Sequence, residues 1–319
     1  MFKQLSTLPK IIVILGPTAS GKSDLAVKIA KQFNGEVIST DSRQVYKGLN
    51  IGSGKITKKE MKGIPHHLLD MASPKKTFTV AQYQKLAKKA IKQILSKDKI
   101  PIICGGTGFY IDALIYNYHL PEVPPQPKLR KTLEKKSTKE LFQQLKKFDP
   151  QRAKNIDKNN RRRLIRALEI ILTTKLPVPI LATTSGSKRI VPYDVLKIGI
   201  KKSPEELKKL ISKRLEKRLK IGMVQEVERL HNGSALSPEG KPSASYGVNW
   251  QRLDDLGLEY RYVSRYLRKL ITKKEMIETL NKEIYRYSKR QMTWFRRDKN
   301  IYWVKKEKEA EKLVKRFLI

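Results

Sequence analysis

A glycine-rich segment at positions 16–23 constrains the fold of this chain more than any other feature. Its residues are Gly16, Pro17, Thr18, Ala19, Ser20, Gly21, Lys22 and Ser23, which match the pattern G-x-x-x-x-G-K-[ST]. A β-branched run at 11–15 precedes the segment, and helix-spaced apolar residues at 24–33 follow it. Backbone N–H groups of such a loop attract phosphate oxygens, and the Ser23 hydroxyl can ligate Mg²⁺. We therefore expect a phosphate-binding loop; the alternative is a tight turn, which would not need Lys22.

Strands and helices alternate through the first third of the chain. Further strands are expected at 36–39 and 100–104, with a helix at 79–95 before the second of them. This alternation is typical of a parallel sheet with right-handed crossovers. A later strand at 193–200 is expected to return to the same sheet. The predicted fold class is therefore α/β, a P-loop NTPase-like parallel sheet flanked by helices.

A proline-rich interval at 119–127 interrupts the alternation. Helical patterns alone follow it, at 137–148 and 160–173, so we expect an all-helical insertion domain at 119–189 between two parts of the core, 1–118 and 190–319. The second part should hold basic C-terminal helices. We expect them at 204–231, with Ser203 as the N-cap, and at 273–295, separated by an irregular segment that includes 234–255.

The charge of the chain predicts a polyanionic partner. Lys and Arg total 69 while Asp and Glu total 30, which gives a formal net charge of +39. Such an excess repels itself in a compact chain, so nucleic acid is the first candidate partner and an anionic membrane surface the second. Cys104 is the one cysteine, which excludes an intramolecular disulfide and a Cys-rich metal site. With no apolar stretch long enough to span a membrane, the sequence indicates a cytoplasmic protein.

Two features are expected near the phosphate loop. Asp41 follows the second strand, at the edge where open parallel sheets bind their ligands. Its position alone favours a helix N-cap over a catalytic carboxylate. A glycine-rich turn at 105–108 follows the next strand. The pair His66 and His67 lacks two further spaced ligands, which argues against a metal site.

Two basic segments suit RNA. Arg162, Arg163 and Arg166 share one face of a predicted helix, where a helix dipole would prefer acidic residues. The segment 289–297 interleaves aromatic rings with cations, as RNA-binding surfaces do, although Trp294 could equally belong to the core.

Taken together, these segments resemble the tRNA dimethylallyltransferase (isopentenyltransferase) family along nearly the whole chain. The resemblance rests on ordered matches at 16–23, 41–48 with 50–52, 63–70, 105–110, 163–169 and 289–297. It implies transfer of a dimethylallyl group from its diphosphate to N6 of an adenine next to the anticodon of tRNA, at position 37, with Mg²⁺ as cofactor. The implied partners are dimethylallyl diphosphate and the tRNA anticodon stem-loop, and we expect a monomer.

The resemblance also assigns roles to residues. It implies catalytic roles for Asp41, Thr18 and Arg214, with Asp41 as the base in place of the N-cap, and diphosphate binding by the loop 16–23, with Ser23 at the metal. The residues implied to meet tRNA are Asp41, Ser42, Arg43, Gln44, Thr107, Arg130, Arg162, Arg163, Arg166, Lys289, Arg290, Gln291, Trp294 and Arg296. The chain departs from the common family pattern at 244–249 and at Arg218, which replaces a common methionine.

Two other classes of function compete with this one. A P-loop kinase of a small metabolite would use the same loop and Asp41, but it leaves the segment 289–297 unexplained. A non-catalytic RNA-binding protein would bind RNA without needing Asp41, Lys22 or Mg²⁺.

Overall fold

A computed structural model of the chain describes residues 8–179, 191–233 and 247–319. They belong to two compact units, which are described separately below. The first unit combines Met1–Ile115 with Val191–Ile319, and the second is Tyr116–Ile190. None of the helices in the described part of the chain is long and apolar enough to cross a membrane.

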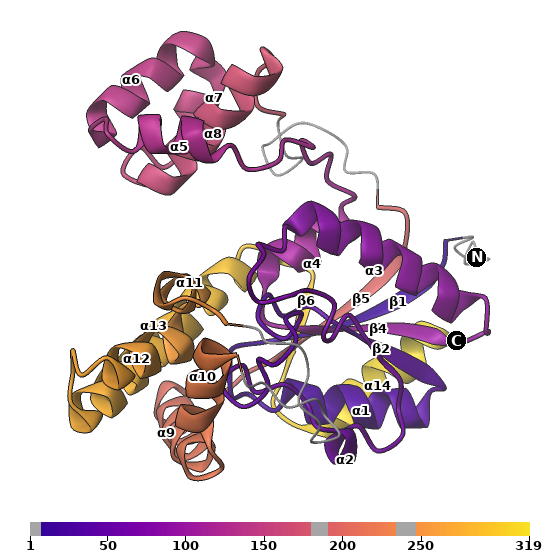
Figure 1. Cartoon of the computed structure of the whole chain (residues 1–319). Helices are drawn as coiled ribbons and strands as arrows, with labels where there is room; N and C mark the ends of the chain where they lie inside the picture. The colour runs from indigo at the N-terminus through magenta and orange to yellow at the C-terminus, as the bar shows by residue number, and fades with distance from the viewer. Residues whose placement is uncertain (1–7, 180–190, 234–246) are drawn as a thin grey trace. The chain divides into compact units, whose positions relative to one another are not determined.

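The first unit contains a six-stranded parallel sheet with the strand order β3-β2-β4-β1-β5-β6 (Figure 1). The strands are β1 Lys10–Leu15, β2 Gly35–Ser39, β3 His66–His67, β4 Ile100–Gly105, β5 Asp194–Ile200 and β6 Ile301–Val304. The central strand β1 pairs with β4 and β5, which aligns Ile14 with Cys104 and Ile198. The parallel sheet and the returning strand predicted from the sequence are confirmed. Its carboxyl edge therefore collects the loops that follow β1, β2 and β4.

Helices cover both faces of this sheet. Helices α1 Lys22–Gln32 and α14 Glu307–Leu318 lie on one face, and α3 Val80–Leu95 and α4 Gly108–Ile115 lie on the other (Figure 1). On the first face, Leu25 and Ile29 of α1 and Val314 of α14 belong to one apolar cluster with Ile12 and Ile14 of β1. Burial on both faces explains why the strands read as continuous apolar runs rather than alternating patterns.

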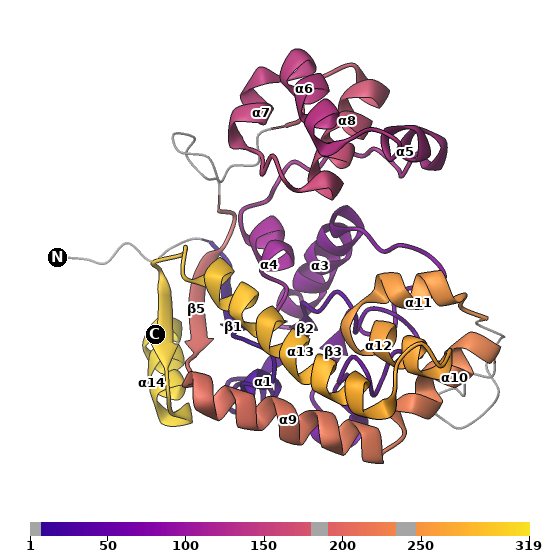
Figure 2. The same cartoon turned by 90° about the vertical axis from the view of Figure 1, so that its left-hand side faces the viewer.

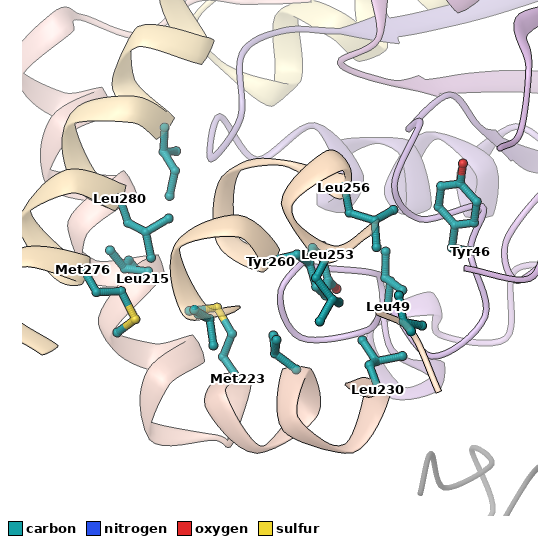
Figure 3. Packing of buried hydrophobic residues seen from close by; sticks show 14 of the residues in the cluster. Tyr46, Leu49, Leu215, Met223, Leu230, Leu253, Leu256, Tyr260, Met276 and Leu280 are labelled. Carbon is teal, nitrogen blue, oxygen red and sulfur yellow. The ribbon is translucent and has the colours of Figure 1, made fainter. Parts of the chain in front are cut away.

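A second apolar core holds the helices of the C-terminal part. These are α9 Pro204–Lys220, α10 Met223–Asn232, α11 Trp250–Leu256, α12 Leu258–Leu267 and α13 Lys273–Phe295, and the short α2 Lys58–Met61 lies in the loop after β2. Leu215, Met223, Tyr260 and Leu280 pack in this core with Leu49 of the loop that follows β2 (Figure 3). Helices α9 and α13 lie side by side (Figure 2). The core thereby fixes α9 and α13 against the loop after β2.

In the second unit, the regular secondary structure of the described residues is all helical. Its helices are α5 Pro127–Leu133, α6 Thr138–Phe148, α7 Pro150–Asn155 and α8 Arg161–Thr174. A capping box begins α6, because Ser137 accepts the Glu140 N–H and Glu140 accepts the Ser137 N–H. Leu141 and Leu145 of α6 pack with Leu164 of α8 in a core of their own. The sequence places its insertion at 119–189.

Two predictions about the C-terminal part are wrong. The helix expected at 204–231 is two helices, because Gly222 lies between them with a left-handed φ of 101° that an α-helix does not adopt. The segment expected to be irregular contains α11, which begins after the N-cap Asn249. Residues 234–246 of that segment, including part of the divergent stretch 244–249, lie outside the described residues. The helix at 273–295 is confirmed as α13.

Candidate active site

The phosphate loop adopts the conformation that the motif predicts. It leaves β1 at Leu15 and enters α1 at Lys22, so the N–H groups at the start of α1 point toward the loop. Gly21 has a φ of 88°, which is strained for residues with a side chain. The Lys22 ammonium donates to the Pro17 carbonyl at 3.3 Å and thus folds back over the loop. Burial lowers the pKa of Lys22.

A cavity of about 680 Å³ opens in front of this loop. It is lined by the loop residues 18–23, by Asp41 and Gln44 after β2, by Gly54, and by Lys213, Arg214 and Lys217 of α9. The Arg214 guanidinium donates to Thr18 Oγ1 at 3.3 Å and to the Gly54 carbonyl at 3.4 Å. Burial lowers the pKa of Arg214 to about 10, with the neighbouring Arg218 contributing. Lys22 and Arg214 are half-buried, and within the described part of the chain neither forms a salt bridge with the carboxylates that also line the cavity, Asp24, Asp41, Glu60 and Glu206, so both remain available to an anionic ligand.

Asp41 lines the cavity from the loop that follows β2. Its Oδ1 accepts the backbone N–H of Arg43 at 2.8 Å and that of Gln44 at 3.3 Å. Residues 42–45 form a turn and no helix begins there, so the helix N-cap favoured by position alone is wrong. One carboxylate oxygen therefore holds the turn, and neither of these bonds uses the other oxygen.

A second cavity, of about 280 Å³, adjoins the first. The residues common to both cavities are Thr18, Asp41, Ser53 and Tyr287. The second cavity is also lined by Ser42 and Arg43 of the turn, by Arg218, Glu259 and residues 260–262, and by Arg290 of α13. Asp41 and Thr18 thus stand at the border between the cavity in front of the loop and a smaller one whose lining includes Tyr260, Tyr262 and Tyr287.

Buried amide and hydroxyl groups connect the loops at this edge of the sheet. Gln291 of α13 is buried; its Oε1 accepts the Thr18 N–H at 2.8 Å, and its Nε2 donates to the Gly106 carbonyl at 2.9 Å. Thr107 Oγ1 accepts the Ser42 N–H at 3.2 Å. The sequence expects both Gln291 and Thr107 to meet tRNA, whereas these bonds join the chain to itself.

The basic segment at the end of α13 divides between two faces of the helix. Arg290 lines the second cavity, while Lys289 and Arg296 line a third cavity, of about 880 Å³, on another face of α13. That third cavity is also lined by Lys201, Lys202 and Lys305, with Glu206 as its one lining carboxylate among the described residues. The segment therefore presents cations in two directions.

Trp294 of the same segment packs inside the first unit. Its Nε1 donates to Asp112 Oδ2 at 2.9 Å, and the Arg297 guanidinium lies 3.8 Å from its ring centroid. A Cβ on Gly108 would approach its ring to 2.2 Å, so the glycine makes room for it. These contacts favour the core alternative for Trp294 that the sequence left open.

In the second unit, the arginines expected to meet tRNA differ in their surroundings. Arg130 and Arg166 both donate to the fully buried Glu169, at 2.7 Å and 2.6 Å. Although burial raises the pKa of Glu169, the bonds from Arg130, Gln126 and Arg166 lower it overall. Arg162 and Arg163, by contrast, are exposed at the start of α8. The face predicted for Arg162, Arg163 and Arg166 therefore contains two exposed cations and one that is paired internally.

The sequence did not find several residues of these cavities, and local patterns give little signal for them. Tyr287 of α13 borders both cavities, and burial raises its pKa to about 12. Arg218 is buried, donates to Glu259 at 2.8 Å and to the Gly52 carbonyl at 3.1 Å, and thus anchors the loop after β2. Arg214 and Arg218 are four residues apart on one helix, and this spacing is the signal that could have shown that their side chains are neighbours.

His66 and His67, the pair considered as metal ligands from the sequence, each have a structural partner. His67 Nε2 lies 2.8 Å from Glu36 Oε2, and His66 Nδ1 lies 2.8 Å from the Ile64 carbonyl. Among the described residues, no group of three or more His, Cys, Asp or Glu side chains could hold a metal ion.

The fold and these cavities define the class: a P-loop protein of the α/β type, in which the cavity in front of the loop meets a second cavity at Asp41. Comparison with known proteins narrows the class further. The family model "IPP transferase" matches residues 44–298. The chain belongs to this family.

Individual relatives agree with the family model. A protein of Acetivibrio thermocellus named tRNA dimethylallyltransferase is 40% identical over 314 residues, which are 97% of this chain and 96% of the relative. The solved structure of the full-length tRNA isopentenylpyrophosphate transferase of Bacillus halodurans is similar with a TM-score of 0.68 and 34% identity, covering 97% of this chain and 96% of that one. A eukaryotic dimethylallyltransferase described as acting on tRNA is similar with a TM-score of 0.76 and 28% identity, covering 93% and 74%.

Proposed function

We propose that this chain is an enzyme that transfers the dimethylallyl group of dimethylallyl diphosphate to N6 of the adenine at position 37 of tRNA. The observation that carries the proposal is the place of Asp41 at the border of the two cavities. A group transfer between two substrates needs a site on each side of the reacting atoms. The names of the relatives, which combine tRNA with a dimethylallyl or isopentenyl donor, support the same assignment.

The first cavity suits the diphosphate of the donor. The C–O bond of the donor must loosen before the weakly nucleophilic amine can attack, so negative charge develops on the departing diphosphate. Lys22, Arg214 and the loop amides place positive charge there, and such electrostatic stabilisation is commonly the largest contribution to catalysis. The Thr18 amide already donates to Gln291, so we assign the diphosphate to the loop amides beyond it.

Mg²⁺ fits the chemistry of the same cavity. The Ser23 hydroxyl and the carboxylates of Asp24 and Asp41 line it, and hard cations of this kind prefer oxygen ligands. Ser20 Oγ of the same loop is buried and has no hydrogen-bond partner among the described residues, which also fits an oxygen-rich ligand. When bound, Mg²⁺ would neutralise charge on the diphosphate. We propose Ser23 as its protein ligand.

The second cavity suits an adenine turned out of its stack. Removing a base from a stack costs a few kcal/mol, and the cost is lowest in a single-stranded loop such as the anticodon loop. As the C–N bond forms, the exocyclic amine becomes acidic, and Asp41 can accept its proton. A positioned base of this kind contributes about 10²- to 10⁴-fold.

The remaining parts of the proposal concern the partner and the setting. The exposed cations of α8 and α13, Arg162, Arg163, Lys289, Arg290 and Arg296, would neutralise backbone phosphates of the anticodon stem-loop. We also propose that the enzyme acts as a monomer. We further propose that it acts in the cytoplasm, together with its tRNA substrate.

The decisive experiment is incubation of the purified protein with labelled dimethylallyl diphosphate, Mg²⁺ and unmodified tRNA, followed by nucleoside analysis. We expect label in N6-dimethylallyladenosine and competition by inorganic pyrophosphate, with no reaction driven by ATP. Phosphorylation of a small molecule by ATP would identify a P-loop kinase instead. Binding of tRNA without transfer, insensitive to changes at Asp41 and Lys22, would identify a non-catalytic RNA-binding protein.

A further inference from the structure

Gln291 makes two hydrogen bonds that fix the orientation of its amide. Its Oε1 can only accept, and it faces the Thr18 N–H at 2.8 Å; its Nε2 can only donate, and it faces the Gly106 carbonyl at 2.9 Å. A flipped amide would oppose donor to donor and acceptor to acceptor. The residue is 6% exposed, so water does not compete freely for either partner. Gln291 thus joins α13 to the loops that follow β1 and β4.

The residue that Gln291 holds stands at the border of the site. Thr18 lines both cavities, and its hydroxyl accepts from the Arg214 guanidinium at 3.3 Å. A continuous chain of contacts therefore runs from Gln291 through Thr18 to Arg214. A shift of Thr18 would move the start of the phosphate loop and remove one of the two hydrogen bonds that position Arg214.

We propose that Gln291 is a positioning residue for the transfer reaction, and that it acts by holding Thr18 against Gly106 rather than by contacting tRNA. The proposal rests on the proposed function. Because the reacting groups must be aligned closely, a misplacement on the order of 1 Å can cost about 10²-fold in rate. The effect of losing Gln291 should therefore appear in the donor reaction and not in the affinity for tRNA.

Gly106 offers a second way to break the same link. A Cβ at this position would lie 2.2 Å from Gln291 Nε2, and contacts under 3.0 Å cannot be kept, so Gly106→Ala must push the amide away. The backbone of Gly106 is not in the left-handed region, so alanine adds no conformational strain there. Gln291→Met removes both hydrogen bonds while keeping a similar side-chain length. The two substitutions thus attack one link from opposite ends.

The experiment compares Gln291→Met, Gly106→Ala and the double variant with the parent. It measures kcat and KM for dimethylallyl diphosphate at saturating tRNA, together with the Kd for tRNA. We expect each single substitution to lower kcat/KM by about 10- to 100-fold and to leave the tRNA Kd within about twofold. The double variant should lose no more kcat/KM than the more impaired of the two single variants, because the effects of substitutions that break one shared interaction are not additive.

Gln84→Met is the matched control. Gln84 of α3 is also a buried glutamine, and its Nε2 donates to the Ala113 carbonyl at 2.7 Å on α4, on the face of the sheet opposite to α1 (Figure 1). We expect it to lower Tm as much as Gln291→Met does, with the kinetic constants of the parent. Equal kinetic loss in both variants would reduce Gln291 to a general stabilising role and overturn the proposal.

Amide exchange tests the link without any turnover. In the parent, the Thr18 N–H should exchange slowly, and in Gln291→Met and Gly106→Ala it should exchange at least about tenfold faster. The proposal would be contradicted if Thr18 exchange were unchanged or if Gln291→Met kept the kinetic constants of the parent. It would also be contradicted if the losses in the double variant were additive, or if the only loss were in tRNA affinity. If the parent transferred no label, the proposed function would fail. The Thr18 amide exchange and the pyrophosphate affinity of these variants would still decide whether Gln291 positions the loop.

Discussion

The carboxylate of Asp41 accepts the backbone N–H of Arg43 at 2.8 Å, and this bond uses Oδ1. The same oxygen accepts the Gln44 N–H at 3.3 Å. The residue therefore combines a structural task, which needs one oxygen acceptor, with the catalytic task proposed above, which needs a basic oxygen. The two tasks can be separated by substitution.

Asp41→Asn is the substitution that separates them. Asparagine keeps an oxygen that can accept the Arg43 N–H but cannot take a proton from the substrate amine. We expect transfer to fall by about 10²- to 10⁴-fold in single-turnover assays. The tRNA Kd should stay within about threefold of the parent, and the Tm should be unchanged. Turnover equal to that of the parent would remove Asp41 from the mechanism.

Binding of tRNA should depend strongly on salt. If roughly five cations pair with backbone phosphates, a single-strand coefficient near 0.7 per contact gives a log-log slope of about −3.5. Replacing the exposed Arg162 and Arg163 with alanine should make this slope shallower by about 1.4 and weaken different tRNAs alike.

Arg166→Ala is a less suitable probe of the same surface. It removes a partner of the buried Glu169, so it should lower stability as well as charge. Filter binding at several salt concentrations, together with Tm, distinguishes the two kinds of arginine. A flat salt response would show that the charges of α8 form a solvated surface.

We expect Trp294 to contribute to the stability of the fold and not to tRNA binding. Trp294→Phe keeps a ring beside Arg297 but removes the Nε1 donor to Asp112, so we expect a lower Tm, by a few degrees, with tRNA affinity within about twofold. If the ring instead stacked on a base, Trp294→Ala would cost about 1 to 3 kcal/mol of tRNA binding, because alanine removes the ring. Fluorescence-monitored unfolding and filter binding on the same preparation distinguish these outcomes.

Glu36 should make stability depend on pH. Burial raises its pKa, but hydrogen bonds from His67, Lys99 and Lys97 outweigh burial and lower it to about 2, from an ordinary value of 4.5. A lowered pKa stabilises the folded state above the unfolded pKa, and this contribution is lost as the pH falls from about 5 toward 2. Glu36→Gln should therefore cost on the order of 1 to 3 kcal/mol of unfolding free energy at pH 7.

The pH series supplies its own control. The difference between Glu36→Gln and the parent should shrink at pH 3, where the unfolded carboxyl is protonated, and denaturant titrations at both pH values measure it. A constant difference across this range would show that the glutamate acts through packing and not through its charge.

Several elements could be predicted because their causes are local. The glycine and lysine spacing of residues 16–23 and the apolar run before it define the loop and β1 without reference to the rest of the chain. Thr272 forms a capping box with Glu275, which explains why the start of α13 could be read directly. The break at Gly222 was missed because the apolar pattern continues across it, and a single glycine does not reveal its φ.

The site was only partly predictable. The motif and the family resemblance name the loop, Asp41 and Arg214, and the structure brings these residues to one cavity. Gln291 and Trp294 were expected to contact tRNA, but they bond to other parts of the chain. The expectation failed because both lie in one segment with surface cations, while their side chains are on the inward face of the helix. Sequence adjacency on a helix does not determine which face is buried against other elements.

The sequence by itself determined the class of the chain: a phosphate loop on a parallel sheet, a helical insertion and a large positive charge. Those features depend on residue type and on neighbours within a few positions. Only the tertiary structure decided that Thr18 is held by Gln291, 273 positions away, and that Asp41 stands between two cavities. Such contacts arise when separate elements pack on shared apolar cores, and the packing, rather than any local pattern, sets which polar groups meet.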